Sequence, residues 1–305
     1  MSTTGLNIIK RNIHEDISSE LDRIGIHCRI HARVKDKDSL EEKIENRGKG
    51  YYSEGGKKIQ DLIGFRITTY FIEDVKLLWD LFSGKYEKVG ESYDEITEEN
   101  IESFKPMRKN LICKFSEENT QTFDEIKYQD EILNLVENTF EIQFRTTLSE
   151  GWHEVDHVLR YKCKEDWTDL LVESRMLNGI YASLETSDQA LKGLFDDLAY
   201  HHYKNKNWEA MLRTKYRLKF EKRPLSTELC HILDENSTLA KEIFRFERKR
   251  IIEKIAYSKL HIPITFDNLV LIINYINLNN DDINANTPAI IMLDFENYLI
   301  KENIF

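Results

Sequence analysis

The apolar pattern of the chain changes once, near residue 165, and this change limits the folds that the sequence can adopt. Upstream of that point, four segments alternate apolar and polar residues as strands do: 30–34, 65–71, 110–115 and 139–146. Helical patterns lie before, between and after these strands. They cover 1–27, a segment that begins with a capping-box tetrapeptide at 38–41, 74–82 and 148–161. Residues 166–305 are almost wholly helical in pattern, apart from an Asn/Asp-rich loop expected at 277–286. We therefore expect an α/β or α+β sheet domain followed by helices alone.

Composition excludes several classes of protein. With 305 residues, 41% of them hydrophobic, the chain can bury a full core. Its longest apolar stretch, at 269–276, is too short to span a bilayer, and the N-terminus has no signal-peptide pattern. We therefore expect a cytoplasmic protein without a membrane partner. The four cysteines form no Cys-x-x-Cys pair, so they imply neither a zinc site nor a disulfide framework.

Charge is distributed unevenly along the chain. The formal net charge of -11 argues against a protein that coats nucleic acid, because such proteins need an excess of Lys and Arg. Residues 204–259 nevertheless carry nine lysines and six arginines against eight acidic residues, a net charge of +7. In this basic segment, Lys241, Arg245 and Arg248 are expected on one helix stripe. Such a stripe either contacts a polyanion or is an ordinary solvated helix face.

A group of cations and a hydroxyl crosses from the first predicted strand into the next helix. Arg33 and Lys35 lie at the strand end, and Ser39 and Lys43 share one helix face. Such a group beside a helix N-terminus is suited to bind a polyphosphate, because the helix adds backbone N–H donors. A solvated surface patch is the alternative interpretation.

The last predicted strand combines a buried face with a polar face. Its period of two places Glu141, Gln143 and Arg145 on one side and two apolar residues on the other. Earlier in the chain, Asp61 and Arg66 lie on either side of a glycine turn, where side chains tend to point into a cleft. Together these segments predict the floor of an active site, although each alone would also fit an exposed sheet face or a surface turn.

The predicted helix after this strand extends the polar floor. His157 and Tyr161 lie one turn apart on one face, with Glu154 three residues before the histidine. The opposite face is expected to pack inward, through Trp152, Val155 and Leu159.

Two carboxylates from different segments, Asp61 and Glu141, predict a metal site. Carboxylates hold a hard cation such as Mg²⁺, which bridges phosphate oxygens. The surrounding Arg and Lys residues would offset the charge that grows in a phosphoryl-transfer transition state. The combination predicts Mg-assisted transfer more specifically than any of its parts.

Taken in order, these residues resemble the RelA/SpoT-type alarmone synthetases. The family pattern is R-x-K-x3-S-x2-K, then D-x-x-G-x-R, then E-x-Q-x-R-T, followed by W-x4-H and Y-K. In this sequence it falls on Arg33, Lys35, Ser39 and Lys43, on Asp61, Gly64 and Arg66, on Glu141, Gln143, Arg145 and Thr146, and on Trp152, His157, Tyr161 and Lys162. The resemblance implies a synthetase domain at 1–203, with a nucleotidyltransferase-like mixed sheet flanked by helices. An all-helical C-terminal extension would occupy 204–305, and the hydrolase half of long family members is not expected.

The resemblance also implies an ATP site. Arg33 and Arg66 would sandwich the adenine of ATP, and its phosphates would contact Lys35, Ser39 and Lys43.

The catalytic residues implied by the resemblance lie beside that site. Asp61 and Glu141 would hold Mg²⁺, and Glu141 would also draw the proton from the attacking hydroxyl. Gln143, Arg145 and His157 would line the acceptor side. The implied reaction moves the β,γ-diphosphate of ATP to the 3′-hydroxyl of GDP or GTP and makes (p)ppGpp.

One loop departs from the family pattern. Family members usually carry Tyr-x-Ser-x-His before the penultimate strand, and its tyrosine stacks on guanine. The corresponding residues 104–111 contain neither Tyr nor His. Phe104 or Arg108 could stack on the base instead, with Lys105 as a further acceptor contact.

Three functions therefore stay open. The first is a small, synthetase-only enzyme that uses GDP or GTP. The second is a toxin-like member that pyrophosphorylates the 3′ end of tRNA, with the basic segment as its tRNA contact. The third is a catalytically inactive nucleotide sensor or interaction module, against which the two intact carboxylates count. The expected partners are ATP and the acceptor, and a homo-oligomer is left open.

Overall fold

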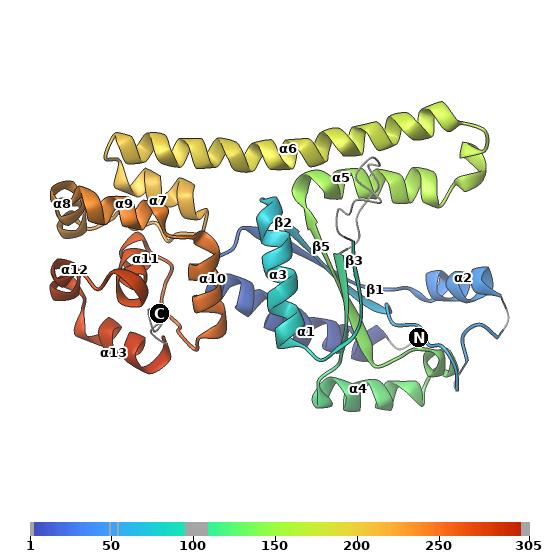
Figure 1. Ribbon diagram of the computed structural model, residues 1–305. Coiled ribbons are helices and arrows are strands. Elements are labelled where there is room, and N and C mark those ends of the chain that lie inside the picture. Colours follow the sequence, from blue (N-terminus) through green and yellow to red (C-terminus); the bar gives the residue numbers. More distant parts are fainter. Residues whose placement is uncertain (1–2, 49, 54, 95–108, 300–305) are drawn as a thin grey trace. The chain divides into compact units, whose positions relative to one another are not determined.

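The computed structural model describes residues 3–48, 50–53, 55–94 and 109–299 (Figure 1). The chain divides into two compact units. The sheet unit consists of Met1–Ser18 and Cys28–Gln189, and the helical unit consists of Ser19–His27 and Ala190–Phe305. The helices α1 (Thr3–Ile24) and α6 (Leu171–Lys204) continue from one unit into the other. The functional domain limits of 1–203 and 204–305 stay a prediction.

The sheet unit is built on a five-stranded mixed sheet with the strand order β1-β2-β5-β4-β3. Its strands are β1 (Cys28–Val34), β2 (Ile63–Thr69), β3 (Lys88–Tyr93), β4 (Lys109–Lys114) and β5 (Thr139–Thr146). Strands β2 and β5 are parallel, and the other neighbouring pairs are antiparallel. The expected mixed sheet is confirmed. Its parallel pair brings the C-terminal ends of β2 and β5 to the same edge.

One face of the sheet forms the core of this unit. Strand β5 buries its apolar residues there, because they alternate with polar ones: Phe140, Ile142 and Phe144. The helices that contribute aromatic rings to this core are α3 (Ile72–Lys85) and α4 (Glu117–Lys127). The ring of Phe82 in α3 stacks on Phe144 at 6.2 Å, and the ring of Phe123 in α4 lies 5.5 Å from Phe115. The opposite face of the sheet is polar and carries the candidate site.

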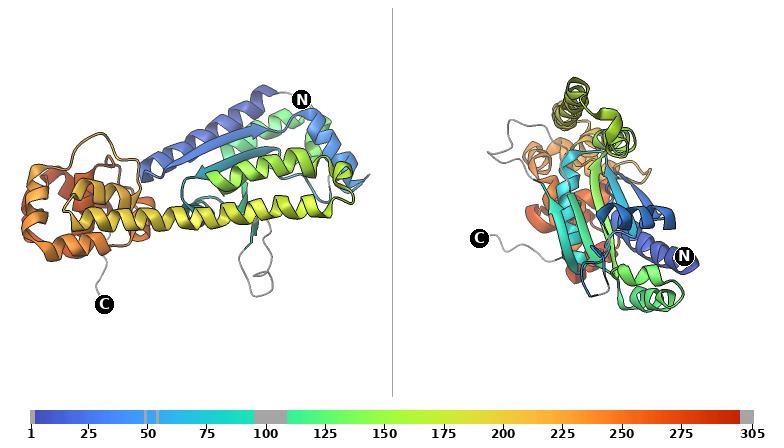
Figure 2. Two further views of the ribbon diagram at one scale, coloured as in Figure 1. Left: turned by 90° about the horizontal axis from the view of Figure 1, so that it is seen from above. Right: turned by 90° about the vertical axis from the view of Figure 1, so that its right-hand side faces the viewer.

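The chain passes from β5 directly into helices. These are α5 (Thr147–Asp156), the π-helix η2 (His157–Tyr161), the 3-10 helix η3 (Lys164–Trp167) and then α6. Thr146 begins α5 with a capping box, in which its hydroxyl accepts from the Ser149 backbone N–H at 3.1 Å. Helices α5 and α6 lie side by side (Figures 1 and 2), and the rings of Trp152 and Tyr181 are 4.9 Å apart.

The described part of the helical unit contains helices and loops, apart from an isolated bridge between Ile26 and Leu218. The helices after α6 are α7 (Trp208–Tyr216), α8 (Thr227–Glu235), α9 (Ser237–Arg245), α10 (Arg248–Tyr257), α11 (Phe266–Ile273), the π-helix η4 (Asn274–Leu278), α12 (Asp281–Asn286) and α13 (Ala289–Tyr298). The expected helical C-terminal region is confirmed. Among the helices that the structure describes, none has both the length and the apolar character to cross a membrane.

Two local expectations are wrong. Helix α2 (Lys37–Arg47) does not begin at the capping-box tetrapeptide, because Asp36 caps it and accepts from the Ser39 backbone N–H at 2.7 Å. The segment expected as a loop at 277–286 contains the end of η4 and all of α12. Asn280 caps α12 by accepting from the Ile283 backbone N–H at 3.1 Å. Asparagine is favoured both in turns and at the N-caps of helices, and in this segment the Asn-rich pattern marks the start of a helix.

The prediction that one face of the helix after β5 packs inward is only partly confirmed. Trp152 is 4% exposed, but Val155 and Leu159 are 47% and 58% exposed. Helix α5 ends at Asp156 and continues as a π-helix, whose wider turn changes the direction of the residues that follow. Leu159 therefore leaves the stripe that Trp152 begins.

The basic residues expected on one helix stripe lie on two helices. Lys241 and Arg245 are exposed on α9, whereas Arg248 is the first residue of α10. The Arg248 side chain is buried, and its Nε donates to the Tyr216 backbone carbonyl at 2.6 Å. Arg248 therefore connects helices within the helical unit and is not placed to contact a partner's phosphates.

Candidate active site

The polar face of the sheet brings the motif residues together. Residues directly opposite each other on neighbouring strands have side chains on the same face. Arg33, Gly64 and Glu141 form one row across β1, β2 and β5, and Arg66 and Gln143 lie in the next row. A small pocket over these rows is lined by His31, Phe65 and six of the predicted residues: Arg33, Asp61, Gly64, Arg66, Glu141 and Gln143.

Gly64 leaves the middle of the first row open. A Cβ atom at this position would meet no heavy atom within 4 Å, so there is space above the sheet. A side chain here would stand between Arg33 and Glu141, which lie opposite Gly64 on the two flanking strands. The glycine therefore keeps room for a ligand between a cation and a carboxylate.

Asp61 is held by two lysines. The Lys35 Nζ lies 2.9 Å from Asp61 Oδ2, and the Lys43 Nζ lies 2.7 Å from each carboxylate oxygen. Burial favours the neutral carboxyl, but the two ammonium groups outweigh it and hold the pKa of Asp61 below its ordinary value. Burial lowers the pKa of Lys35, and the nearby positive charges add to this effect while Asp61 opposes it. The two lysines that are predicted to bind the phosphates of ATP therefore contact Asp61, the carboxylate that is predicted to bind the metal ion.

Glu141 lies in a less charged environment. Its Oε1 accepts from Asn110 Nδ2 at 2.9 Å, and its Oε2 accepts from Gln143 Nε2 at 2.9 Å. Burial and then the charge of Asp61 raise the pKa of Glu141, although the Gln143 hydrogen bond and the lysines act in the opposite direction. A carboxylate with a raised pKa is a stronger base than an ordinary glutamate, so Glu141 is suited to accept a proton from a hydroxyl.

A second network joins the sheet to α5. The Arg66 Nε donates to Gln143 Oε1 at 3.2 Å, and the Arg66 Nη1 pairs with both Glu150 and Glu154. The Arg145 Nη1 lies 3.3 Å from Glu150 Oε2. Hydrogen bonds in the guanidinium plane are compatible with a base stacked on its flat face. The contact of Arg66 with adenine stays a prediction.

His157 lies at the border of this region. It begins η2, and its ring stacks on Tyr161 with 5.7 Å between centroids. Burial lowers the pKa of His157, and the positive charges of Lys162 and Arg33 add to the shift. The imidazole is therefore mostly neutral at pH 7, and its acceptor-side role stays a prediction.

Among the described residues that were predicted for the site, five do not line this pocket: Lys35, Ser39, Lys43, Arg145 and His157. Ser39 donates its hydroxyl to Asp36 Oδ2 at 3.0 Å and so serves the N-terminus of α2. The predicted acceptor contacts Phe104, Lys105 and Arg108 lie outside the described residues.

Sequence reasoning missed Asn110 and Glu150. Asn110 faces Gln143 across the β4–β5 pair, and strand pairing of this kind leaves no local signal in one sequence. Glu150 lies four residues before Glu154, a spacing that places both carboxylates on one face of α5. The sequence spacing of these two glutamates could therefore have indicated a charged network on this face of the helix.

The donor set fits a magnesium ion. Asp61 and Glu141 lie near enough for the charge of Asp61 to raise the pKa of Glu141, and both offer hard oxygen donors. Over the described part of the chain, no group of three or more His, Cys, Asp or Glu residues forms a metal cage. Mg²⁺ commonly uses one or two carboxylates and completes its shell with water and substrate phosphates. Two carboxylates therefore suit a magnesium ion that binds together with a nucleotide.

Comparison with known proteins confirms the resemblance that the motifs carry. Residues 32–166 match the family described as the region found in RelA/SpoT proteins, so the chain contains a RelA/SpoT-type region. No curated protein matches the chain significantly.

Several solved structures are similar to part of the chain. Small alarmone synthetase 1 from Bacillus subtilis is 18% identical with a TM-score of 0.43, and the match covers 61% of this chain and 92% of that one. A GTP pyrophosphokinase family protein from Streptococcus pneumoniae is 21% identical with a TM-score of 0.45, over 64% and 89% of the two chains. Small alarmone synthetase 2 from Bacillus subtilis is 19% identical with a TM-score of 0.42, over 64% and 98%. At these identities no activity is transferred from them.

Proposed function

We propose that the chain is an ATP-dependent pyrophosphokinase that transfers the β,γ-diphosphate of ATP to the 3′-hydroxyl of GDP or GTP. The RelA/SpoT-type region supports the general class, a pyrophosphotransferase. The observation that carries the proposal is the placement of Lys35 and Lys43 on Asp61, beside a second carboxylate, Glu141, whose pKa is raised.

The donor site would use the cations of β1 and α2. When ATP binds, the ammonium groups of Lys35 and Lys43 would exchange their contacts with Asp61 for contacts with phosphate oxygens. Arg33 would stack on the adenine from β1, and Arg66 would do so from β2. Asp61 and Glu141 would hold Mg²⁺, which when bound supplies positive charge to the triphosphate.

The transfer step needs a base and a stabilised leaving group. The acceptor 3′-oxygen would form a bond to the β-phosphorus, the bond between that phosphorus and the oxygen bridging to the α-phosphorus would break, and AMP would leave. The hydroxyl proton would pass to the Glu141 carboxylate, which lies in the same pocket. Lys35 and Lys43 would offset the negative charge that develops on the transferred group.

The alternatives make different predictions about the acceptor. The tRNA hypothesis relied on the altered acceptor loop, which lies outside the described residues, and on the basic segment. In the expected stripe of that segment, Arg248 is buried and bonded within the helical unit. A catalytically inactive module would have no need of two carboxylates in one pocket. Neither alternative is favoured by an observation of its own.

The proposal is tested by offering acceptors separately to the purified protein with β- or γ-labelled ATP. The acceptors are GDP, GTP, AMP, ADP and bulk tRNA. We expect the label on GDP or GTP. Label on tRNA alone would support the toxin-like function instead, and no transfer to any acceptor would support the inactive module.

A further inference from the structure

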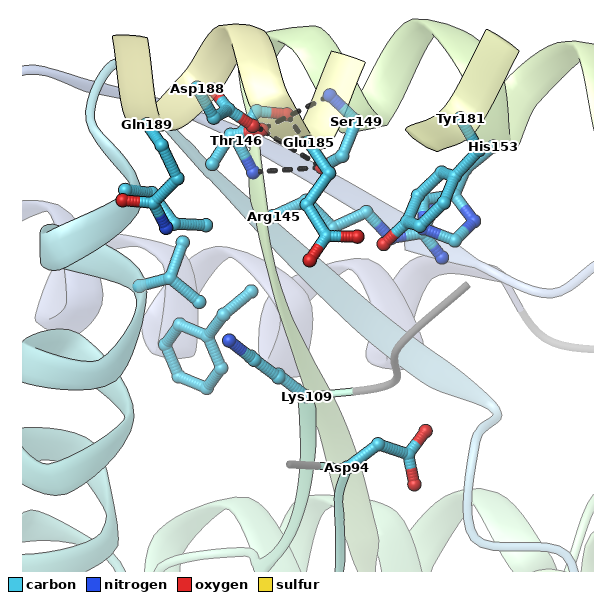
Figure 3. Close-up of a pocket in the computed structure, with 13 residues that line it drawn as sticks. Asp94, Lys109, Arg145, Thr146, Ser149, His153, Tyr181, Glu185, Asp188 and Gln189 are labelled. Carbon is cyan, nitrogen blue, oxygen red and sulfur yellow. Dashed lines mark hydrogen bonds between the residues drawn. The ribbon is translucent and has the colours of Figure 1, made fainter. Parts of the chain in front are cut away.

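A cavity of about 250 Å³ lies at the C-terminal end of β5 (Figure 3). It lies beyond the active-site pocket at the end of β5, where Arg145 follows Gln143 on the polar face and Phe144 and Thr146 line the cavity from the other face. Alternate residues of a strand lie about 7 Å apart, so the two spaces are neighbours. The other walls come from α5 and α6, from Ile72 and Val75 of α3, and from Asp94 and Lys109 at the ends of β3 and β4.

The α6 wall carries two carboxylates. Figure 3 shows the Glu185 side chain extending from α6 into the cavity. Among the described residues, no hydrogen bond or ion pair engages Glu185. Asp188 is 3% exposed, and its Oδ2 accepts from the Thr146 hydroxyl at 2.6 Å, while its Oδ1 has no hydrogen-bond partner in the described structure. Burial raises the pKa of Asp188, and the charge of Glu185 adds to this shift. Glu185 therefore favours a ligand that brings hydrogen-bond donors.

Two aromatic rings and two cations also line the cavity, and they suit a flat ring that carries an anion. The rings of His153 and Tyr181 lie 5.9 Å apart and line the cavity together. Burial, with the charges of Arg145 and then Arg66, lowers the pKa of His153 to about 3, so this ring is neutral at pH 7. The cations among the lining residues are Arg145 and Lys109.

A nucleotide combines these features, and its base decides how well it fits the α6 wall. The Watson–Crick edge of guanine places a ring N–H and an amino group side by side, so one carboxylate can accept both hydrogen bonds. The same edge of adenine places its amino group beside a ring nitrogen that is itself an acceptor, and this nitrogen would face the carboxylate unfavourably.

We propose that this cavity binds the base of the acceptor nucleotide and that Glu185 selects guanine by accepting hydrogen bonds from its ring N–H and amino group. The inference rests on the proposed function and adds to it the residue that sets acceptor specificity. Thr146 and Asp188 act as positioning residues, because their hydrogen bond ties the end of β5 to the part of α6 that carries Glu185.

The test compares GDP with inosine diphosphate, which lacks only the 2-amino group. Wild-type protein should prefer GDP in kcat/KM by about 10-fold or more, the usual effect of losing a hydrogen bond to a charged acceptor. Glu185→Gln should lose most of this preference, mainly through a higher KM for GDP. Glu173→Gln makes the same change at an exposed position of α6 and should retain it. Calorimetric titration with GDP should give the same order of affinities without turnover, and thermal melting checks that each variant is folded.

The outcomes separate the inference from the proposed function. If the wild type uses GDP and Glu185→Gln keeps the same preference over inosine diphosphate, the role of Glu185 is wrong while the pyrophosphokinase activity stands. Should Glu185→Gln fail to fold, Glu185→Ala and Glu185→Asp are measured in the same way, and an unchanged preference in a folded variant overturns the role. If the wild type neither binds nor modifies guanine nucleotides, both proposals fail.

Discussion

At the scale of single residues, neighbouring charges give the two carboxylates of the site different properties. Lys35 and Lys43 keep Asp61 ionised, although burial opposes this. Glu141 lies deeper, beside a like charge, and its pKa is raised. Asp61 is thus prepared to hold a cation at neutral pH, and Glu141 to accept a proton. Such a difference between neighbouring carboxylates is typical of sites that divide acid and base roles.

Asp61→Asn and Glu141→Gln should each reduce diphosphate transfer by at least about 100-fold, because each removes a charge that acts on the transition state at nearly constant volume. Transfer is measured with saturating ATP and GDP. Asp38→Asn, at an exposed position of α2, is the matched control and should be fully active. Near-normal turnover by either site variant would contradict the assigned roles.

The lowered pKa of His153 predicts that the folded protein loses stability as the pH falls. The folded protein keeps this ring neutral down to about pH 3, whereas the unfolded chain binds a proton near pH 6.5. Unfolding therefore takes up a proton in this window, and the stabilising contribution of the neutral ring, fully present above pH 6.5, is lost as pH falls. The slope is at most about 1.4 kcal/mol per pH unit.

The free energy of unfolding between pH 7 and pH 5 should thus fall less steeply in His153→Gln than in the wild type. His261→Gln, at an exposed position, is the control and should follow the wild type. An NMR titration of the His153 ring with a midpoint above pH 6 would show that the ring is not buried in this way.

At the scale of elements, the transition from β5 into α5 organises both the pocket and the cavity. Thr146 ends the strand that carries Glu141, caps α5 and donates to Asp188 of α6. One hydroxyl therefore fixes the relation between the strand and the α5 and α6 segments of the sheet unit.

Thr146→Val should destabilise the sheet unit by about 2–4 kcal/mol, because it removes a helix cap and leaves a buried carboxyl without its donor. Thr146→Ser keeps the hydroxyl and should cost much less. Urea unfolding followed by circular dichroism measures both. Equal stabilities of the two variants would show that the hydroxyl is not responsible.

The elements also show which parts of the fold a single sequence can predict. The bounds of β5 agree with the prediction, because its alternation is complete and both of its faces are well defined. Strand β3 was missed because Lys88–Tyr93 carries no apolar alternation and is defined by pairing with β4. Likewise, Asp61 and Glu141 could be predicted from local motifs, whereas Asn110 becomes part of the site only through its place opposite Gln143. The π-helix at His157–Tyr161 depends on tertiary packing and has no recognisable sequence pattern.

At the scale of the whole molecule, the excess positive charge of the basic segment belongs to the helical unit. Part of that charge is structural. The Arg217 side chain is buried and lies 3.0 Å from Asp196 Oδ1, and Arg248 donates to a backbone carbonyl. Lys241 and Arg245 remain exposed on α9.

Reversing both exposed charges, with Lys241→Glu and Arg245→Glu, should leave transfer to GDP unchanged, because a free nucleotide needs no extended phosphate contacts. Activity on GDP should also depend only weakly on salt. If tRNA is the acceptor, the same reversal should weaken modification, and wild-type activity should fall steeply between about 50 and 200 mM salt. Arg248→Glu is left out of this test because it would disturb the helical unit itself.

The transfer of a diphosphate, as opposed to a single phosphoryl group, is tested most directly by the nucleotide that ATP leaves behind. Purified wild-type protein is incubated with ATP, Mg²⁺ and GDP, and the products are separated by anion-exchange chromatography and identified by mass. We expect AMP and a guanosine nucleotide carrying a 3′-diphosphate in equal amounts, and neither product with Asp61→Asn. Formation of ADP in place of AMP, or of AMP without a modified guanine nucleotide, would contradict the proposed reaction.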